Sequence, residues 1–257
     1  MQPFTPPPPD PDSQAGAGAP ATPIRDLAVY LAAGFGLYLL ASLVLAQVFR
    51  EVTGLVSALV YALNFACLTG TVYLFGIRRG KLSWSGLGLR PPRWRWSWLF
   101  LIAGAALALI PVRILIGAAS QLLIEGGAQS LQERSQLLMA GGLTWPSFLV
   151  SLAGAGLVVP FSEELFFRGA LHTTIRSRWP LWPAVLASSL LFGLAHFDSP
   201  GVAVSSFILG VASALVYEFT RSVWASFALH AVNNSAAVLL LYAALLATNL
   251  LRAAPSP

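Results

Sequence analysis

Side chains that can take part in acid–base chemistry are concentrated in three short motifs, each within an apolar stretch. The motifs pair two adjacent glutamates with an arginine, a phenylalanine with a histidine, and a histidine with an asparagine. They are Glu163, Glu164 and Arg168; Phe192 and His196; and His230 and Asn234. A carboxylate or an imidazole can take a proton from water, and an amide or imidazole N–H can donate to an oxyanion. These residue types together favour hydrolysis.

The apolar surroundings make such polar groups costly. The chain is 56% hydrophobic and 10% charged, with a mean hydropathy of +0.72, whereas a soluble domain carries about 25% charged residues. The composition is therefore typical of a polytopic membrane protein. An ionisable side chain at the bilayer centre costs about 2.5–3.5 kcal/mol on insertion scales. A cluster of two acids, an arginine and two histidines at that depth therefore indicates a function.

The first 23 residues differ from the rest of the chain. They contain the run Pro6 to Pro9, two aspartates and scattered small residues, and they cannot bury enough apolar surface to fold. We predict a disordered proline-rich tail over residues 1–23. It lacks the basic start and early apolar core of a secretory signal. Residues 24–257 are predicted to form one transmembrane domain, with a motif-bearing core over residues 145–240.

Long apolar runs predict an all-α, polytopic transmembrane bundle of about six to eight spans. The polar stretch Gln121–Thr144 is predicted to be a loop or a short interfacial helix. The apolar runs cover residues 27–49, 52–77, 98–123, 148–175, 181–197, 202–219 and 223–251.

The distribution of cations predicts the orientation of the bundle. The segment from Arg78 to Arg95 carries six Lys or Arg residues and no acid, so the positive-inside rule places it in the cytoplasm. Counting spans from there places the N-terminus inside. Alanine-, leucine- and arginine-rich usage and the small size favour a bacterial inner-membrane protein. The net charge of +5 does not indicate nucleic-acid binding, because the cations lie beside apolar runs rather than in one basic patch.

The three motifs are predicted to lie at similar membrane depth. A helix rises about 1.5 Å per residue, which puts Glu163 about 20 Å and His196 about 21 Å from the inner ends of their spans. On the last span, His230 lies about 14 Å and Asn234 about 20 Å from the inner end. Segments far apart in sequence thus bring polar groups to one level, as a shared site requires.

Helical spacing predicts which side chains face each other. Glu164 and Arg168 are four residues apart and are expected to form an ion pair. Glu163 is rotated by about 100° from Glu164 and faces another direction. We therefore expect Glu163, rather than Glu164, to lie close to His196 and His230.

The three motifs, taken in order, resemble the CAAX prenyl endopeptidase and bacteriocin-processing family of intramembrane proteases, also called the ABI family. They are EELFFR at 163–168, FGLAH at 192–196 and HAVNN at 230–234, and the resemblance covers about residues 150–237. The family implies an all-helical membrane fold in which a glutamate and a histidine activate water, while a second histidine and an asparagine stabilise the oxyanion. Members are often called metalloproteases, although the mechanism can run without a metal.

Carried over to this chain, the resemblance assigns four catalytic roles. Glu163 would be the general base, and His196 would hold and polarise the water. His230 and Asn234 would donate to the tetrahedral oxyanion. The implied activity is that of an intramembrane endopeptidase that hydrolyses a peptide bond.

The remaining motif residues are predicted to support this set. Glu164 and Arg168 would be structural or would orient the substrate, and Phe192 would pack beside the histidine one turn later. Arg168 alternatively binds a substrate carboxylate, since a guanidinium matches that geometry. Arg113, in the third span after Pro111, has no assigned role: it either extends to the interface or pairs across the bundle.

Two other functions fit the same polar groups. One is a non-catalytic peptide-binding or bacteriocin-immunity protein on this scaffold, which is expected to have lost a catalytic residue; none is lost here. The other is a transporter or proton relay, because midplane acids and histidines also mark ion pathways. Transporters often contain inverted repeats, and the N-terminal spans contain no counterpart of these motifs.

No cofactor is predicted, and zinc is the alternative. Glu163, His196 and His230 would then supply three N or O ligands, whereas the lone Cys67 has no second cysteine for a thiolate site. The expected partners are membrane lipid and a peptide or membrane-protein substrate, without nucleic acid. The sequence specifies neither the physiological substrate nor the oligomeric state.

Overall fold

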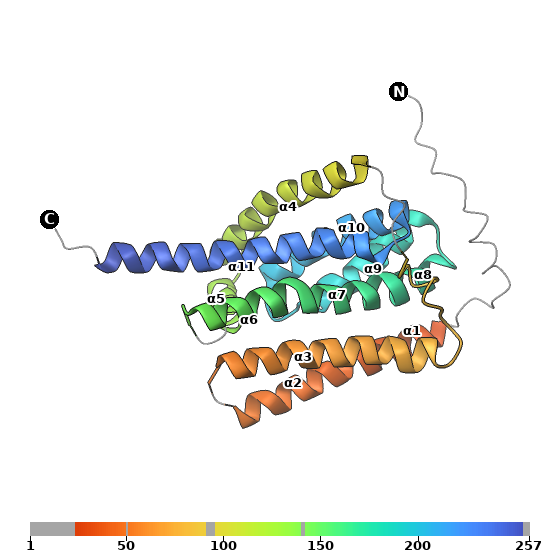
Figure 1. Cartoon of the computed structure of the whole chain (residues 1–257), viewed down its shortest axis with the longest axis horizontal. Helices are drawn as coiled ribbons and strands as arrows, with labels where there is room; N and C mark the ends of the chain where they lie inside the picture. The colour runs from red at the N-terminus through yellow and green to blue at the C-terminus, as the bar shows by residue number, and fades with distance from the viewer. Residues whose placement is uncertain (1–23, 50, 91–95, 140–141, 254–257) are drawn as a thin grey trace.

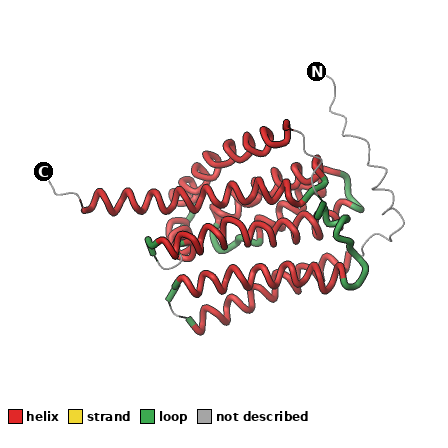
Figure 2. Tube along the Cα trace, viewed as in Figure 1, coloured by secondary structure: helices red, strands yellow, loops and turns green. Residues whose placement is uncertain are grey.

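The chain folds as a bundle of helices, shown in Figures 1 and 2. The computed structural model describes residues 24–49, 51–90, 96–139 and 142–253. The predicted disordered tail, residues 1–23, lies outside them. All regular elements within the described residues are helical, which confirms the predicted all-α class.

Within the described residues, six helices are long and apolar enough to cross a membrane, as expected for an integral membrane protein. Several of them contain wide π-helical turns, labelled η. In chain order the six consist of α1 (Ile24–Tyr30), η2 (Leu31–Gly36) and α2 (Leu37–Val48); α3 (Gly54–Thr71) and η3 (Val72–Ile77); α4 (Trp96–Leu123); α6 (Trp145–Ala153), η4 (Gly154–Val158), α7 (Val159–Glu164), η5 (Leu165–His172) and α8 (Thr173–Arg176); α10 (Pro200–Thr220); and α11 (Val223–Ala253).

The predicted span over residues 181–197 is shorter than expected. Helix α9 (Leu181–Leu194) has 14 residues and is about 21 Å long, less than the ~30 Å of a hydrocarbon core. A turn follows it, and Ser199 is extended before Pro200 opens α10, because a residue before proline disfavours the helical conformation. His196 therefore lies in the turn beyond the helix, not inside a span.

The fourth span forms the centre of the bundle. Half of its apolar stretch is buried, compared with 11% for the first span, and every residue of η5 is buried. Phe166 meets Phe167 edge-on at 5.1 Å between ring centroids, and Phe167 meets Phe192 of α9 at 5.0 Å. This packing fixes the rotation of the two-glutamate segment relative to α9.

A wide turn precedes the two glutamates. Pro160 has no N–H, and its ring clashes with the carbonyl four residues earlier in a regular α-helix. The π-helical segment η4 lies just before this proline, and π turns of this kind are often found at functional sites. The chain then returns to α-helix at α7, which carries Glu163 and Glu164.

Helices α9 and α10 approach closely because the residue between them is small. A Cβ built on Gly210 would lie 3.0 Å from the Ser189 Cβ and 3.1 Å from its Cα. Such contacts between small residues are typical of helix pairs in membranes. The short distance brings the α10 backbone within reach of side chains from the fourth span.

The polar stretch between the third and fourth spans contains the predicted short helix. Helix α5 (Gly127–Leu138) follows Gly126, whose φ of +73° favours glycine. It packs against α4 and α10, and its residues Leu131, Arg134 and Leu138 face the interior cavity described below.

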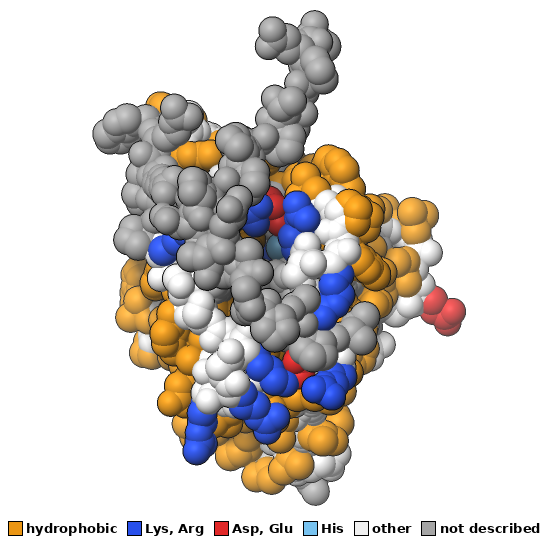
Figure 3. Space-filling view, turned by 90° about the vertical axis from the view of Figure 1, so that its right-hand side faces the viewer, with side chains coloured by type: hydrophobic (Ala, Val, Ile, Leu, Met, Phe, Trp, Pro, Cys, Tyr) orange, Lys and Arg blue, Asp and Glu red, His pale blue; other side chains and the backbone are white. Residues whose placement is uncertain are grey.

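Basic side chains gather at one end of the bundle. Figure 3 shows Lys and Arg side chains on the face at the right-hand end of Figure 1, where α1 begins. In the chain, Arg78 and Arg79 follow η3, Arg176 ends α8, and Arg221 follows α10. This arrangement matches the segments that the positive-inside rule assigned to one side.

Candidate active site

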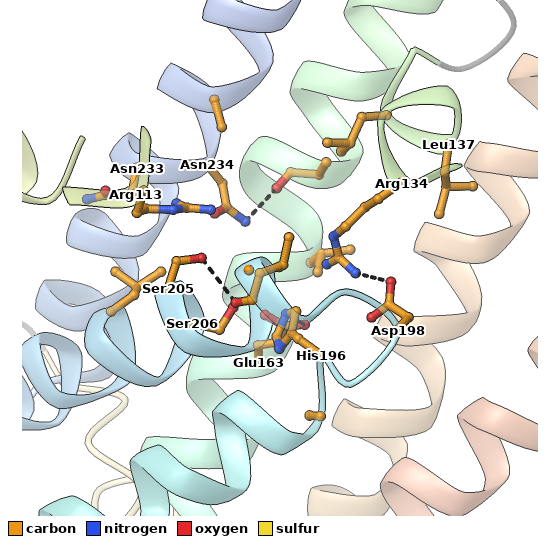
Figure 4. A pocket seen from close by; sticks show the side chains of 18 of the residues that line it. Arg113, Arg134, Leu137, Glu163, His196, Asp198, Ser205, Ser206, Asn233 and Asn234 are labelled. Atoms are coloured by element: carbon orange, nitrogen blue, oxygen red, sulfur yellow. Dashed lines mark hydrogen bonds and ion pairs between the residues drawn. The ribbon is translucent and has the colours of Figure 1, made fainter. Parts of the chain in front are cut away.

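Glu163 lies between two histidines, one from the turn after α9 and one from α11. Its Oε1 is 4.0 Å from the Nε2 of His196, and its Oε2 is 3.7 Å from the Nε2 of His230. Helix α7 supplies the carboxylate, the turn after α9 supplies one ring, and α11 supplies the other (Figure 4 shows the first two). Both distances exceed a direct hydrogen bond but suit a bridging water molecule.

The end of α9 sets the orientation of the His196 ring. The Nδ1 of His196 is 2.9 Å from the backbone carbonyl of Phe192. A carbonyl only accepts, so Nδ1 carries the proton and donates. In the neutral ring Nε2 therefore presents a lone pair, and this lone pair faces Glu163.

Glu164 holds the second histidine. The Nδ1 of His230 is 2.8 Å from the Oε1 of Glu164, and the same oxygen is 3.0 Å from the Nη1 of Arg168. All three side chains are at most 2% exposed. The predicted i, i+4 ion pair between Glu164 and Arg168 is confirmed. The expectation that Glu164 lies away from His230 is wrong, because Glu164 contacts this ring directly.

Arg168 is part of the protein interior and does not line the cavity. Its Nη2 donates to the carbonyl of Gly210 at 3.1 Å, and its guanidinium lies 4.5 Å from the centroid of the Phe192 ring. The neighbouring glutamate, the α10 backbone and the aromatic ring surround this guanidinium, which favours a structural role for Arg168 over the alternative that it binds a substrate carboxylate.

The Phe192 ring contacts the Arg168 guanidinium and both histidine rings. It packs edge-on against His196 at 5.0 Å and against His230 at 5.5 Å between centroids. Phe192 itself is fully buried. One aromatic ring thus fixes both imidazoles, whereas the sequence predicted contact with His196 alone.

Asn234 belongs to the same cavity but occupies another wall. Its Nδ2 donates to the carbonyl of Ala155 in η4 at 3.2 Å. Its Oδ1 is 3.4 Å from the Nη1 of Arg113 in α4. Arg113, for which the sequence left two alternatives, therefore pairs across the bundle and does not extend to the interface (Figure 4).

A cavity of about 710 Å³ contains the four predicted catalytic side chains. Arg134 of α5 and Asp198, in the turn after α9, also line it and form an ion pair at 2.6 Å. Sequence reasoning selected neither of them. The only signal for Asp198 was its place two residues after His196, and nothing in the spacing singled out Arg134.

The third histidine is outside this site. His172, in η5, is fully buried. Its Nδ1 is 3.0 Å from the Ser188 hydroxyl, and its Nε2 is 2.8 Å from Glu218. Glu218 also pairs with Arg221 at 2.9 Å. This cluster joins the end of the fourth span to α9 and α10.

The three residues considered as zinc ligands, Glu163, His196 and His230, lie close together, but their arrangement is not that of a metal site. Within the described ranges, no group of three or more His, Cys, Asp or Glu side chains is arranged to hold a metal ion. The two Nδ1 contacts do resemble the outer hydrogen bonds of metal-binding histidines. The absence of a cofactor stays a prediction.

One of three comparisons with known proteins gave a match. Residues 145–236 match the family model described as Rce1-like, type II CAAX prenyl endopeptidase Rce1-like. No curated protein and no solved structure matches the chain. The matched segment contains all three motifs, including Glu163 and the two histidines beside it. The match confirms, for residues 145–236, the resemblance to the CAAX prenyl endopeptidase family.

Proposed function

We propose that the protein is a CAAX-type intramembrane endopeptidase that uses a water molecule activated by side chains. The observation that carries this proposal is the position of Glu163, with one oxygen 4.0 Å from His196 and the other 3.7 Å from His230, in a cavity within the helical bundle. The family match over residues 145–236 supports the general class.

Glu163 and His196 would activate the water. The lone pair on the Nε2 of His196 accepts one hydrogen bond from the water, and the carboxylate of Glu163 takes its other proton. The hydroxide oxygen then bonds to the carbonyl carbon of the peptide, and the carbonyl π electrons move to oxygen. When the C–N bond breaks, the proton held by Glu163 passes to the leaving nitrogen.

Asn234 and His230 would stabilise the oxyanion. One N–H of the Asn234 amide is used by the carbonyl of Ala155, which leaves the second for the substrate. His230 would donate from Nε2 in its imidazolium form, with Glu164 accepting from Nδ1–H and balancing the charge. Preorganised donors of this kind stabilise the transition state more than the ground state.

Glu164 and Arg168 would hold this arrangement and take no part in proton transfer. They lie on the far side of His230 from Glu163 and do not line the cavity. Removing either one leaves the other charged, buried and without its partner.

The substrate would be a peptide or membrane-protein segment that enters from the membrane. Side chains of the first span, including Phe35 and Tyr38, line the same cavity as the catalytic set. That span is the least buried of the six, at 11%, and it packs mainly on α3. We further propose a bacterial inner-membrane location, with the basic end of the bundle and the N-terminus in the cytoplasm.

A non-catalytic peptide-binding or immunity protein is the second candidate. It would use the same cavity without requiring a base between two histidines. A proton relay is less compatible with the cavity, because Asn234 and Arg113 form its far wall and supply no titrating carboxylate there.

Identification of products separates these functions. Purified protein in liposomes would be incubated with a library of membrane peptides, and new termini would be identified by mass spectrometry. The proposal predicts cleavage by the wild type and by Glu125→Gln, which alters an exposed glutamate after α4, but none by Glu163→Ala. Peptide retention without new termini would support the binding protein and contradict the protease.

A further inference from the structure

Arg113 is a cation within a membrane-spanning helix to which the proposed reaction assigns no role. It lies in the middle of α4, within the span Ser97–Leu123, whose mean hydropathy is 2.5. A charged side chain at such a position costs about 2.5–3.5 kcal/mol on insertion scales and usually marks a functional site. The contacts of Arg113 should therefore explain why the charge is kept.

Arg113 differs from the other two arginines near the cavity. Arg168 pairs with Glu164 at 3.0 Å, and Arg134 pairs with Asp198 at 2.6 Å. Arg113 has no Asp or Glu oxygen within 4.0 Å in the described part of the chain. Its polar contact there is the amide oxygen of Asn234 at 3.4 Å. The guanidinium of Arg113 thus contacts a neutral amide and not a carboxylate.

The amide of Asn234 is held at both ends. Its oxygen faces the guanidinium of Arg113, which can only donate, and its nitrogen faces the carbonyl of Ala155, which can only accept. Rotating the amide by 180° would place its N–H groups against the N–H groups of Arg113. It would also place its oxygen against the carbonyl oxygen of Ala155. The pair of contacts therefore selects a single orientation.

This orientation determines where the free donor points. An amide nitrogen has two N–H groups, and the carbonyl of Ala155 uses one. The second is then fixed in direction, and Asn234 lines the cavity that contains Glu163. Without the guanidinium, only the contact with the Ala155 carbonyl selects between the two amide orientations, and the direction of the free donor is less strictly fixed.

We propose that Arg113 is a positioning residue that fixes the side-chain amide of Asn234 so that one N–H is preorganised toward the reacting carbonyl. The proposal rests on the oxyanion role that the proposed function gives to Asn234. Arg113 acts through Asn234 and does not touch the substrate. Its charge is retained in the membrane because a neutral donor would orient the amide less strongly.

A double-mutant cycle on turnover tests this relationship. Loss of an oxyanion donor costs about 10²–10³ in rate, and misplacement of a group by about 1 Å can cost 10²-fold. We expect Asn234→Ala to lower kcat by about 10²–10³ and Arg113→Met by about 10–10², both with little change in KM. Arg113→Lys should recover part of the loss, because it restores a charged donor. Arg78→Met, at an exposed position, is the matched control.

The decisive variant is the double substitution. If Arg113 acts through Asn234, then Arg113→Met should have no further effect on kcat once Asn234→Ala is present, because coupled residues are not additive. Two independent losses that multiply would overturn the proposal, and so would a rise in KM with an unchanged kcat, which would indicate substrate binding by Arg113.

A second measurement does not depend on turnover. The chain has four asparagines, at 64, 233, 234 and 249, so ¹⁵N-asparagine labelling gives four side-chain amide pairs in an NMR spectrum. Asn234→Ala identifies the pair from Asn234. We expect Arg113→Met to shift this pair and Arg78→Met to leave it in place. An unmoved Asn234 signal would overturn the inference even if the protein is an active protease. A shifted signal in a protein without peptidase activity would instead reject the proposed function alone.

Discussion

His230 donates through Nδ1 to Glu164 across 2.8 Å, and this contact links the last helix to the fourth span. The two residues are 66 positions apart in the chain. The same carboxylate oxygen forms an ion pair with Arg168, which in turn donates to the backbone of α10. The two adjacent glutamates therefore differ in surroundings: Glu164 is fixed in a buried chain of contacts, whereas Glu163 faces the cavity.

Measurements of thermal stability should distinguish the structural role of the Glu164–Arg168 pair from the catalytic role of Glu163. Arg168→Ala leaves Glu164 buried without its cation, and breaking a buried pair typically costs about 3–5 kcal/mol. We expect a lower melting temperature and lower yield for Arg168→Ala, measured in detergent, and little change for Glu163→Gln. Arg78→Ala, at an exposed position, controls for loss of a cation. Equal melting temperatures for Arg168→Ala and the wild type would contradict the structural role.

The contact between α9 and α10 gives a second stability prediction. Gly210→Val adds atoms 3.0–3.1 Å from Ser189 and separates the two helices. Overpacking of this kind costs about 1–3 kcal/mol, and the shift also moves the carbonyl that accepts from Arg168. Thermal unfolding should reveal the loss. Gly104→Val, in α4 with nothing within 4 Å of its Cβ position, should be nearly neutral.

The oxyanion role of Asn234 predicts a particular kinetic pattern. A donor that acts mainly in the transition state affects kcat rather than KM, so Asn234→Ala should reduce kcat by about 10²–10³ and leave KM nearly unchanged. Steady-state peptide release measures both. Asn249→Ala, near the end of α11, is the matched control. An Asn234→Ala enzyme with normal kcat and raised KM would assign the amide to substrate binding.

Removal of metal tests whether the reaction depends on a metal ion. In the proposed reaction the carboxylate, the imidazoles and the amide carry out every proton transfer and charge stabilisation. Peptide release should therefore be insensitive to a strong chelator. Activity that is lost to the chelator and restored by zinc would show that Glu163, His196 and His230 act as ligands instead.

Local spacing predicted part of this structure well. The apolar runs gave the six long helices, and the separation of four residues between Glu164 and Arg168 gave their ion pair. Contacts of this kind depend only on the period of the helix. The end of α9 was missed because the turn chemistry before Pro200 shortens an otherwise apolar run.

Contacts between helices were less accessible from the sequence. The contact between His230 and Glu164 and the contact between Arg113 and Asn234 depend on how each helix is rotated and tilted, which packing of rings such as Phe167 and Phe192 decides. Hydropathy and spacing give membrane depth but not rotation. The family resemblance supplied the candidate residues, whereas their hydrogen-bond partners required the structure.

The central claim is that Glu163 takes the proton from the attacking water, and Glu163→Gln tests it most directly. The substitution keeps the shape and removes the base. With a peptide that the wild type cleaves, single-turnover cleavage and peptide binding would be measured on the same preparation. The account predicts unchanged binding and a loss of cleavage of about 10²–10⁴-fold. Full cleavage by pure Glu163→Gln protein would contradict it.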